Sequence, residues 1–177
     1  MERILKPILL IIAGFLVGSM LLKVVNLKFD YLRNNQTNYY TNITVKERER
    51  QLECLAKNIY YEAAREPFEG KVAVAQVTLN RTESGIFPQD ICKTIYQKNV
   101  FFDKVICQFS WYCERATLKK PMHTEAFDEC YKVAKKVLLE GFRLEGLTEA
   151  LYYHANYVNP GWKKEKVATI GNHIFYK

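Results

Sequence analysis

The sequence predicts an α+β domain that is mainly helical, carries a small β-hairpin near its C-terminus and follows an N-terminal transmembrane helix. Three segments, 46–65, 69–83 and 124–140, show apolar residues at helical spacing. Near the C-terminus, two short apolar-rich runs flank a Gly-Asn pair, which is typical of a two-residue hairpin turn. Because 49% of the 177 residues are hydrophobic and 14% are aromatic, the composition fits one globular core.

The N-terminus is strongly apolar. Residues 7–22 (PILLIIAGFLVGSMLL) carry no charge, and tolerating a snorkelling Lys23 extends the apolar stretch to residues 7–27. Since a helix of ~20 apolar residues spans a bilayer core, we predict a membrane anchor over residues 1–27. A cleavable signal peptide is the alternative, because basic residues precede the stretch and the small residues at 17–19 could be a cleavage site.

The segment after this apolar stretch is polar and rich in asparagine. It shows no helical stripe of apolar residues, so we predict a tether over residues 28–45. The remaining residues, 46–177, are predicted to form one domain, since roughly 130 residues lie within the usual range for a single core.

The first domain helix, predicted over residues 46–65, places a glutamate at the border of its apolar stripe. At 100° per residue, Glu62 lies about 80° from Leu52 and about 20° from Leu55. A carboxyl group at the rim of an apolar face loses solvation when it ionises, so its pKa rises and it can serve as a general acid. The alternative is an ordinary surface charge that pairs with Arg65 at i+3.

The second helix, predicted over residues 69–83, is apolar on nearly all sides. Such a helix is expected at the centre of a domain rather than at its surface. Its interior Gln76 and Asn80 then need hydrogen-bond partners, and Glu62 or Glu66 of the preceding helix could supply them.

The third helix is predicted over residues 124–140 and ends before Gly141, a favourable residue just after a helix. Residues 84–121, between the second and third helices, are predicted to hold loops. After the third helix, ALYYHANYV (150–158) predicts a strand. The runs KVATI and HIFYK, joined by Gly171-Asn172, predict a hairpin.

The formal net charge of +7 and a pI near 9.1 suit an acidic partner. Nucleic acid, anionic lipid and the bacterial cell wall all fit this description. The lysines and arginines are interleaved with acids, as in KERERQLE, whereas nucleic-acid modules gather them on one face. We therefore predict no binding to nucleic acid.

Five cysteines are many for a chain of this size, and none of them forms a C-x-x-C pair. They are Cys54, Cys92, Cys107, Cys113 and Cys130. Disulfides in an exported domain explain them best, with at least one thiol left over and a pairing that cannot be read from sequence. Buried reduced cysteines in a cytosolic protein are the alternative.

Four motifs occur in a fixed order: LAKNIYYEAAREPFEGKVAVAQVTLNR, CQFSW, YYHANYVNPGW and IGNHIFY. With them the chain resembles, over residues 50–177, the SleB/CwlJ family of bacterial cell-wall hydrolases, which also occurs in phages. One departure is visible, because the family run usually reads YxEARGE and this chain has YYEAARE. Ala64 and Arg65 therefore stand where an arginine and a glycine are expected, while Glu62 and Glu66 stay in register.

The resemblance implies a lysozyme-like domain that cuts the β-1,4 bond after N-acetylmuramic acid in peptidoglycan, as a lytic transglycosylase. Glu62 matches the family's catalytic acid, which protonates the leaving oxygen and then accepts the proton of the muramyl 6-hydroxyl, closing a 1,6-anhydro ring. Muramidase-type hydrolysis is the alternative, should Glu66 or Asp103 reach the opposite face of the sugar. We expect a monomer without cofactor, anchored once in the cytoplasmic membrane, with its domain on the cell-wall side.

Polar and aromatic residues of these motifs are predicted to bind the glycan, because sugar rings combine apolar faces with hydroxyl rims. The predicted substrate-binding residues are Glu66, Gln76, Gln108, Ser110, Trp111, Tyr153, His154, Asn156 and His173, with Trp162 as a further stacking ring. Each has a purely structural role as its alternative, such as the packing of the CQFSWYC aromatics under a disulfide.

Three other functional classes were weighed against this one. A zinc amidase would need paired ligands, but His123, His154 and His173 form no H-E-x-x-H, so no metal site is predicted. A cysteine amidase would need a thiolate near a histidine, as in Cys107 or Cys113 with His154, and disulfides in an oxidising compartment argue against it. A membrane-tethered wall-binding module without activity is the remaining alternative.

Overall fold

The structure is a computed structural model that describes residues 14–15, 17–28 and 43–177. The chain divides into two units, Met1–Thr44 and Val45–Lys177. In the first unit, residues 14–15 and 17–28 are helical, and no helix among the described residues is long and apolar enough to cross a membrane. Half of the predicted anchor and most of the predicted tether lie outside the described residues, so both stay predictions.

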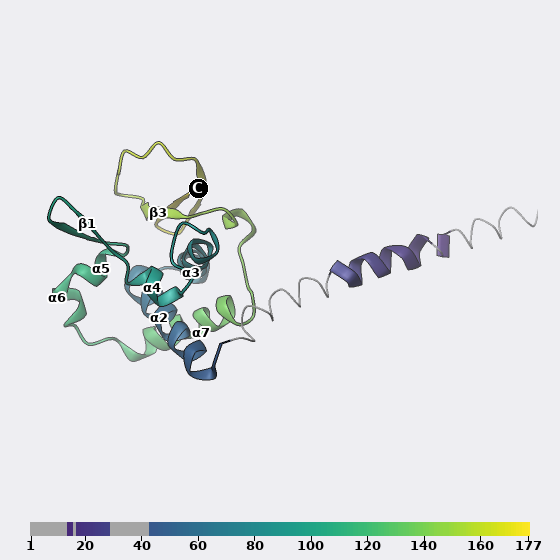
Figure 1. The fold of residues 1–177 in the computed structure, drawn as a ribbon, viewed down its shortest axis with the longest axis horizontal. Coiled ribbons are helices and arrows are strands. Elements are labelled where there is room, and N and C mark those ends of the chain that lie inside the picture. Colours follow the sequence, from purple (N-terminus) through teal and green to yellow (C-terminus); the bar gives the residue numbers. More distant parts are fainter. Residues whose placement is uncertain (1–13, 16, 29–42) are drawn as a thin grey trace, which may run out of the picture. The chain divides into compact units, whose positions relative to one another are not determined.

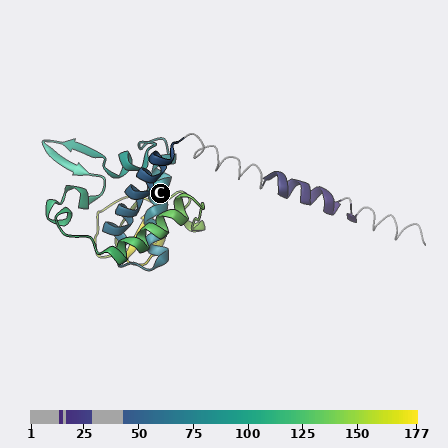
Figure 2. The same ribbon diagram turned by 90° about the horizontal axis from the view of Figure 1, so that it is seen from below.

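Three long helices form the larger part of the second unit. They are α2 (Val45–Ala63), α3 (Phe68–Glu83) and α7 (Thr124–Leu138), each within two residues of its predicted bounds. All three pack against one another, as Figures 1 and 2 show from two directions. Between α2 and α3, Pro67 has the extended backbone of an N-cap, which separates the two helices as the sequence predicts.

Helix α3 is the central helix, because every residue from Gly70 to Thr82 is buried. The predicted partners of its polar residues are wrong. Gln76 donates from Nε2 to the carbonyl of Leu144 (3.0 Å) and accepts from the same residue's N–H (2.7 Å). Asn80 donates to the carbonyls of Leu147 and Ala150 (2.7 and 2.9 Å). The side-chain amides of Gln76 and Asn80 therefore hydrogen-bond to backbone groups of the segment 144–150, and not to a glutamate.

Short elements occupy the region between α3 and α7, where only loops were predicted. They are α4 (Ile91–Ile95), β1 (Lys98–Phe101), β2 (Lys104–Cys107), α5 (Ser110–Cys113) and α6 (Arg115–Leu118). Elements of four or five residues are too short to show a period. The β1–β2 turn also gives no signal, because Phe102 and Asp103 adopt positive φ (44° and 63°) where glycine or asparagine is usual.

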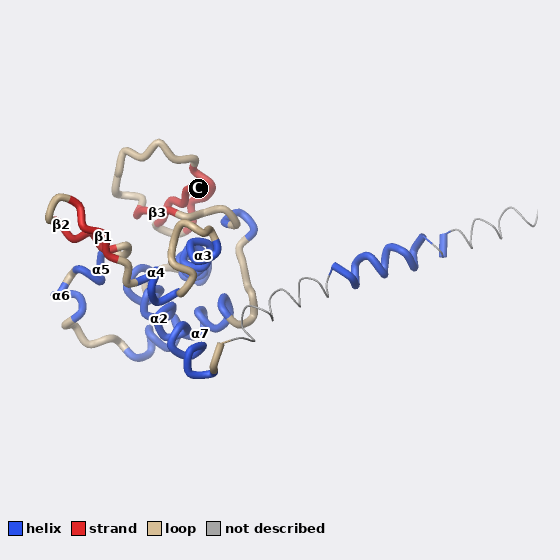
Figure 3. The backbone as a smooth tube through the Cα atoms, in the orientation of Figure 1, coloured by secondary structure: helices blue, strands red, loops and turns tan. Residues whose placement is uncertain are grey.

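A second small sheet follows α7 and η1 (Glu145–Leu147), and Figure 3 shows it apart from the β1–β2 hairpin. Its antiparallel strands lie in the order β3 (Tyr152–Ala155), β5 (His173–Tyr176), β4 (Lys166–Ile170). Gly171 and Asn172 form the β4–β5 turn, with Gly171 at a φ of 56°. The predicted strand and hairpin are both confirmed.

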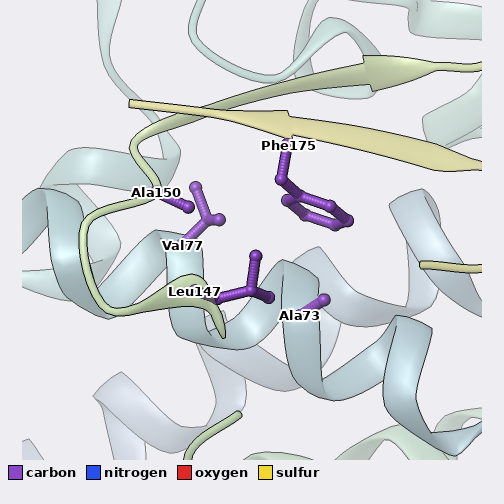
Figure 4. Packing of buried hydrophobic residues seen from close by; sticks show 5 residues of the cluster. All are labelled: Ala73, Val77, Leu147, Ala150 and Phe175. Atoms are coloured by element: carbon purple, nitrogen blue, oxygen red, sulfur yellow. The ribbon is translucent and has the colours of Figure 1, made fainter. Parts of the chain in front are cut away.

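The sheet packs on α3 through a compact apolar cluster, shown in Figure 4. The cluster consists of Ala73, Val77, Leu147, Ala150 and Phe175. Along β5 burial alternates, so His173 and Phe175 face inward while Ile174 and Tyr176 are half-buried. This packing sets the sheet beside the C-terminal end of α2.

Two disulfides join neighbouring elements. Cys54 of α2 pairs with Cys92 of α4, and Cys107 of β2 pairs with Cys113 of α5. Cys130 of α7 is a buried free thiol, so the prediction of four oxidised cysteines and one left over is confirmed.

Thiol counting in denaturant without reductant should therefore find one free thiol per chain. Reducing both disulfides should lower the free energy of unfolding, because losing a native disulfide from a small exported domain typically costs ~2 to 5 kcal/mol. Urea denaturation with and without reductant measures this difference. Cys130→Ser is the matched control, since it removes the only free thiol of the five cysteines and should leave the effect of reductant unchanged. Five reactive thiols in freshly exported protein would contradict the assignment.

Candidate active site

Glu62 lies in the last turn of α2, where its carboxyl group is half-buried. Burial raises the pKa of Glu62 to about 7, which outweighs the opposing effects of a hydrogen bond from Tyr153 and of the Arg81 charge. Glu114 adds to the increase by charge repulsion. Near neutral pH this carboxyl group therefore exists in both protonation states, as a group that first donates and then accepts a proton requires.

Tyr153 fixes the orientation of Glu62 from β3. Its hydroxyl donates to Oε2 of Glu62 at 3.0 Å, and no other described residue hydrogen-bonds to this carboxyl group. The Tyr153 ring packs on Phe175 and meets the edge of His173 (centroids 5.5 and 5.3 Å apart). Burial raises the pKa of Tyr153 well above its usual value, so the hydroxyl stays protonated and remains a donor. The other oxygen, Oε1, is left to exchange a proton with a ligand.

The guanidinium group of Arg81 places a buried positive charge near Glu62 and Tyr153. It comes from the last turn of α3, is 4% exposed, and donates from Nε to the carbonyl of Leu151 at 2.8 Å. Its guanidinium group lies over the rings of Phe87, Phe109 and Tyr153. The Arg81 charge acts to lower the pKa of Glu62, so it stabilises the carboxylate that forms once the proton has left.

Two hollows lie along this face of the domain. The first has a volume of about 350 Å³ and is lined by Tyr60, Tyr61, Glu62, Ala63, Ala64, Arg65, Glu66, Thr117, Lys120 and Pro121. The second has about 410 Å³ and is lined by Lys57, Tyr61, Tyr96, Trp111, Tyr112, Leu118 and Met122. Tyr61 belongs to both, so they flank a single ring, with Glu62 in the first hollow. We call the first one the Glu62 groove.

Glu66 lies in the Glu62 groove but is engaged by the β4–β5 turn. Its two carboxylate oxygens accept hydrogen bonds from the backbone N–H and the side-chain amide of Asn172, both at 2.9 Å. Partial burial acts to raise the pKa of Glu66, but these hydrogen bonds outweigh it and leave the pKa lowered. A Cβ on Gly171 would lie 2.0 Å from Oε2 of Glu66, so only glycine allows the turn to dock this closely.

Three of the predicted substrate-binding residues are buried, namely Gln76, Trp111 and His173, and the assignment of Gln76 is corrected. Gln76 is 0% exposed and both ends of its amide are bonded to Leu144. Trp111 is 4% exposed, donates from Nε1 to Oδ1 of Asn58 at 3.0 Å, and stacks on Tyr61 (centroids 4.5 Å apart). Trp111 therefore supports Tyr61, and the ring in contact with both hollows is that of Tyr61.

The other predicted residues lie around the site without lining either hollow. They are Gln108, Ser110, Tyr153, His154, Asn156 and His173. His154 bonds Tyr176 Oη and its neighbour's carbonyl (both 2.9 Å), while His173 is buried against the Tyr153 ring, and its burial lowers the pKa of the imidazole. Of the predicted set, Glu66 alone lines the groove with Glu62.

Sequence reasoning missed Arg81 and Tyr61. An arginine at the end of a helix is ordinary, so only the burial of Arg81 distinguishes it. Tyr61 lies about 180° from Leu52 around α2, away from the apolar stripe, and the Trp111 ring that stacks on it comes from a segment predicted to be loop. Asp103, considered as a second carboxylate, lies in the β1–β2 turn and lines neither hollow.

A half-buried glutamate with a raised pKa, beside a hollow of a mainly helical α+β domain, has the protonation behaviour that a general acid requires. The chain belongs to the cell wall hydrolase family of the SleB/CwlJ type, whose family model matches residues 65–176. This match begins three residues after Glu62, so the role of Glu62 rests on the geometry given above.

Cys107 and Cys113 are bonded to each other, and burial raises the pKa of the Cys130 thiol to about 11, which disfavours a cysteine nucleophile.

Relatives and solved structures agree with this family. The chain is 30% identical over 129 residues to the spore cortex-lytic enzyme of Oceanobacillus iheyensis, covering 71% of this chain and 41% of that protein. It is 29% identical over 132 residues to that of Bacillus subtilis, covering 70% and 36%. The chain thus spans about two fifths of the length of these curated relatives.

The fold is similar to that of solved SleB catalytic domains. For the germination-specific lytic transglycosylase SleB of Bacillus anthracis the TM-score is 0.55 at 24% identity, covering 77% of this chain and 98% of that one. For SleB of Bacillus cereus it is 0.54 at 24% identity, covering 77% and 94%. These likenesses support the mainly helical, lysozyme-like α+β fold.

Activity of the full chain should fall as pH rises through about 7, because the protonated form of Glu62 is then lost. The profile of kcat/KM against pH measures this pKa. Tyr153→Phe removes a hydrogen bond that lowers the pKa of Glu62, so the midpoint of the decline should move to higher pH. A profile that stays flat between pH 6 and pH 8 would argue against Glu62 as the acid.

Proposed function

We propose that this protein cleaves peptidoglycan glycan strands at the β-1,4 bond after N-acetylmuramic acid, as a lytic transglycosylase. The observation that carries the proposal is the Glu62 carboxyl group, whose pKa of about 7 and single hydrogen bond from Tyr153 suit a group that gives up a proton and takes one back. The relatives' names, spore cortex-lytic enzyme and lytic transglycosylase, support a peptidoglycan substrate.

In this mechanism the protonated Oε1 of Glu62 gives its proton to the glycosidic oxygen as the bond to muramic C1 breaks. The resulting carboxylate is stabilised by the Tyr153 hydroxyl and by the Arg81 charge. It then accepts the proton of the muramyl 6-hydroxyl as that oxygen attacks C1. The products are a free hydroxyl on the departing glycan and a 1,6-anhydromuramyl end, and Glu62 is protonated again.

Internal attack is favoured because Glu66 is poorly placed to activate water. It follows Glu62 by only four residues, and Asn172 bonds both of its oxygens. Glu114 supports hydrolysis as the second candidate, because it comes from the α5–α6 segment and lies near enough to raise the pKa of Glu62. A carboxylate on a different element could activate a water molecule.

Product analysis separates these two reactions. Mass spectrometry of muropeptides released by the full chain should find mainly 1,6-anhydromuramyl ends, which resist borohydride. Glu114→Gln should leave this product distribution unchanged. If reducing muramic acid dominates, and Glu114→Gln abolishes it, the enzyme is a muramidase that uses Glu114 as its base.

For localisation we propose that residues 7–27 anchor the protein in the cytoplasmic membrane, with the domain on the cell-wall side. The length of the apolar stretch and the two disulfides, which require an oxidising compartment, support this arrangement. Fractionation followed by protease treatment of intact spheroplasts tests it. Protection of the domain from protease would place it on the other side of the membrane.

A further inference from the structure

Two cations with no acidic partner line the Glu62 groove. Arg65 follows the end of α2, and Lys120 comes from the segment that follows α6. Both side chains are exposed, and none of the ion pairs formed among the described residues includes either of them. The groove thus receives one positive charge from each of two separate segments.

The acids of the same groove do not neutralise these cations. Glu66 is committed to Asn172 through both of its oxygens. Glu62 is bonded to Tyr153 and is faced by the buried charge of Arg81. Arg65 and Lys120 are therefore available to donate hydrogen bonds to an anionic group of a ligand that lies beside Glu62. A guanidinium group can bind a carboxylate through two parallel hydrogen bonds.

Peptidoglycan offers an anion at this place. Its sugar rings are neutral, but the lactyl group on C3 of muramic acid carries a peptide stem with free carboxylates. When muramic C1 lies at Glu62, the substituent on C3 of the same ring lies only a few ångströms away. Arg65 is three residues beyond Glu62, just after the end of α2, and lines the same hollow.

We propose that Arg65 and Lys120 form a carboxylate-binding subsite for the peptide stem of the muramic acid at the cleaved bond. This inference rests on the proposed function and adds a substrate preference to it, for glycans that keep their stems over glycans that have lost them. A phosphodiester polymer attached to the wall would offer the same kind of charge, so the test separates the two sources.

The test compares two substrates with the full chain. Both are glycan strands freed of phosphodiester polymers with hydrofluoric acid, and one has also lost its stems to an amidase. The wild type should show a KM about 2- to 30-fold lower on stem-bearing strands, the range expected for two exposed charge contacts. In the double variant Arg65→Gln/Lys120→Gln the ratio of the two KM values should fall toward one.

The matched control is Arg115→Gln/Lys119→Gln. It removes the same charge from α6 and its C-cap, and neither residue lines a hollow. This control should keep the wild-type ratio. If it loses the ratio to the same extent, the preference comes from the general charge of the domain, and the subsite is disproved.

Other outcomes are equally decisive. Equal KM values of the wild type on both substrates would overturn the inference while leaving the proposed function intact. Equal KM values on the two treated substrates, with a lower KM on strands that keep their phosphodiester polymers, would identify the ligand as a phosphodiester and overturn the stem assignment. If no strand is cleaved at all, the proposed function fails. Stem-dependent binding of the strands, lost in Arg65→Gln/Lys120→Gln, would even then support the subsite.

Discussion

Replacing Glu62 with glutamine is expected to reduce glycan cleavage by ~10²- to 10⁴-fold, the typical contribution of a general acid. The amide keeps the shape of the side chain and can still bond the Tyr153 hydroxyl, but it has no proton to transfer to the leaving oxygen. Release of soluble muropeptides by the full chain measures the loss. Glu69→Gln is the matched control, because Glu69 is exposed and lines neither hollow.

The same variant should also change how stability depends on pH. Because burial raises the pKa of Glu62 from 4.5 to about 7, the native state holds a proton between these values that the unfolded state has lost. The wild type should therefore lose stability as pH rises from about 4.5 through about 7, and Glu62→Gln should not show this loss. Wild-type cleavage by a folded Glu62→Gln variant would show that Glu62 is not the acid, whereas wall binding without cleavage by the wild type itself would favour the wall-binding module.

Phe175→Ala should lower the free energy of unfolding by ~3 to 5 kcal/mol, the usual cost of removing a large aromatic ring from a core. Phe175 is 0% exposed, belongs to the cluster that holds the sheet on α3, and packs against Tyr153. Its loss leaves a cavity under the residue that orients Glu62. Urea denaturation measures the change in stability, and cleavage assays at low temperature measure the accompanying loss of activity.

Ile174→Ala is the control for this prediction, since the neighbouring side chain is only half-buried and points away from the cluster. It should cost clearly less than Phe175→Ala, and activity should be retained. A cost below about 1 kcal/mol for Phe175→Ala would show that the sheet is held by other contacts.

The parts of the fold that could be predicted are those with a long repeating pattern or a specific turn. Helices α2, α3 and α7 each contain at least 15 residues, which is long enough to show a helical period. The β4–β5 hairpin has a Gly-Asn pair at its turn, and this pair is typical of two-residue hairpins. The β1–β2 hairpin was missed because its turn consists of Phe102 and Asp103, which lack the sequence signal that Gly171-Asn172 gives the β4–β5 turn. The anchor at residues 7–27 stays a prediction.

For the site, helical phase placed Glu62 at the border of the apolar stripe, because burial depends on where a residue lies around its helix, and the resemblance to the family then implied its catalytic role. The supporting residues depend on contacts between distant segments, which no local pattern contains. Gln76 was misassigned because its partner, Leu144, lies 68 residues away, and Arg81 was missed because a buried charge looks like a surface charge in sequence. Trp111 lines the second hollow and stacks on Tyr61, and a tryptophan in a motif can support a neighbouring ring as well as bind a sugar, so its role as a sugar-binding ring stays a prediction.

The two hydrogen bonds that complete the site also determine when it can form during biosynthesis. The Tyr153–Glu62 and Asn172–Glu66 bonds join residues 91 and 106 positions apart, so α2 is synthesised long before its partners. Until β3 and the β4–β5 turn have been synthesised, Glu62 lacks its orienting hydroxyl and the burial that raises its pKa. We expect a chain that stops before β3 to be unable to cut glycan.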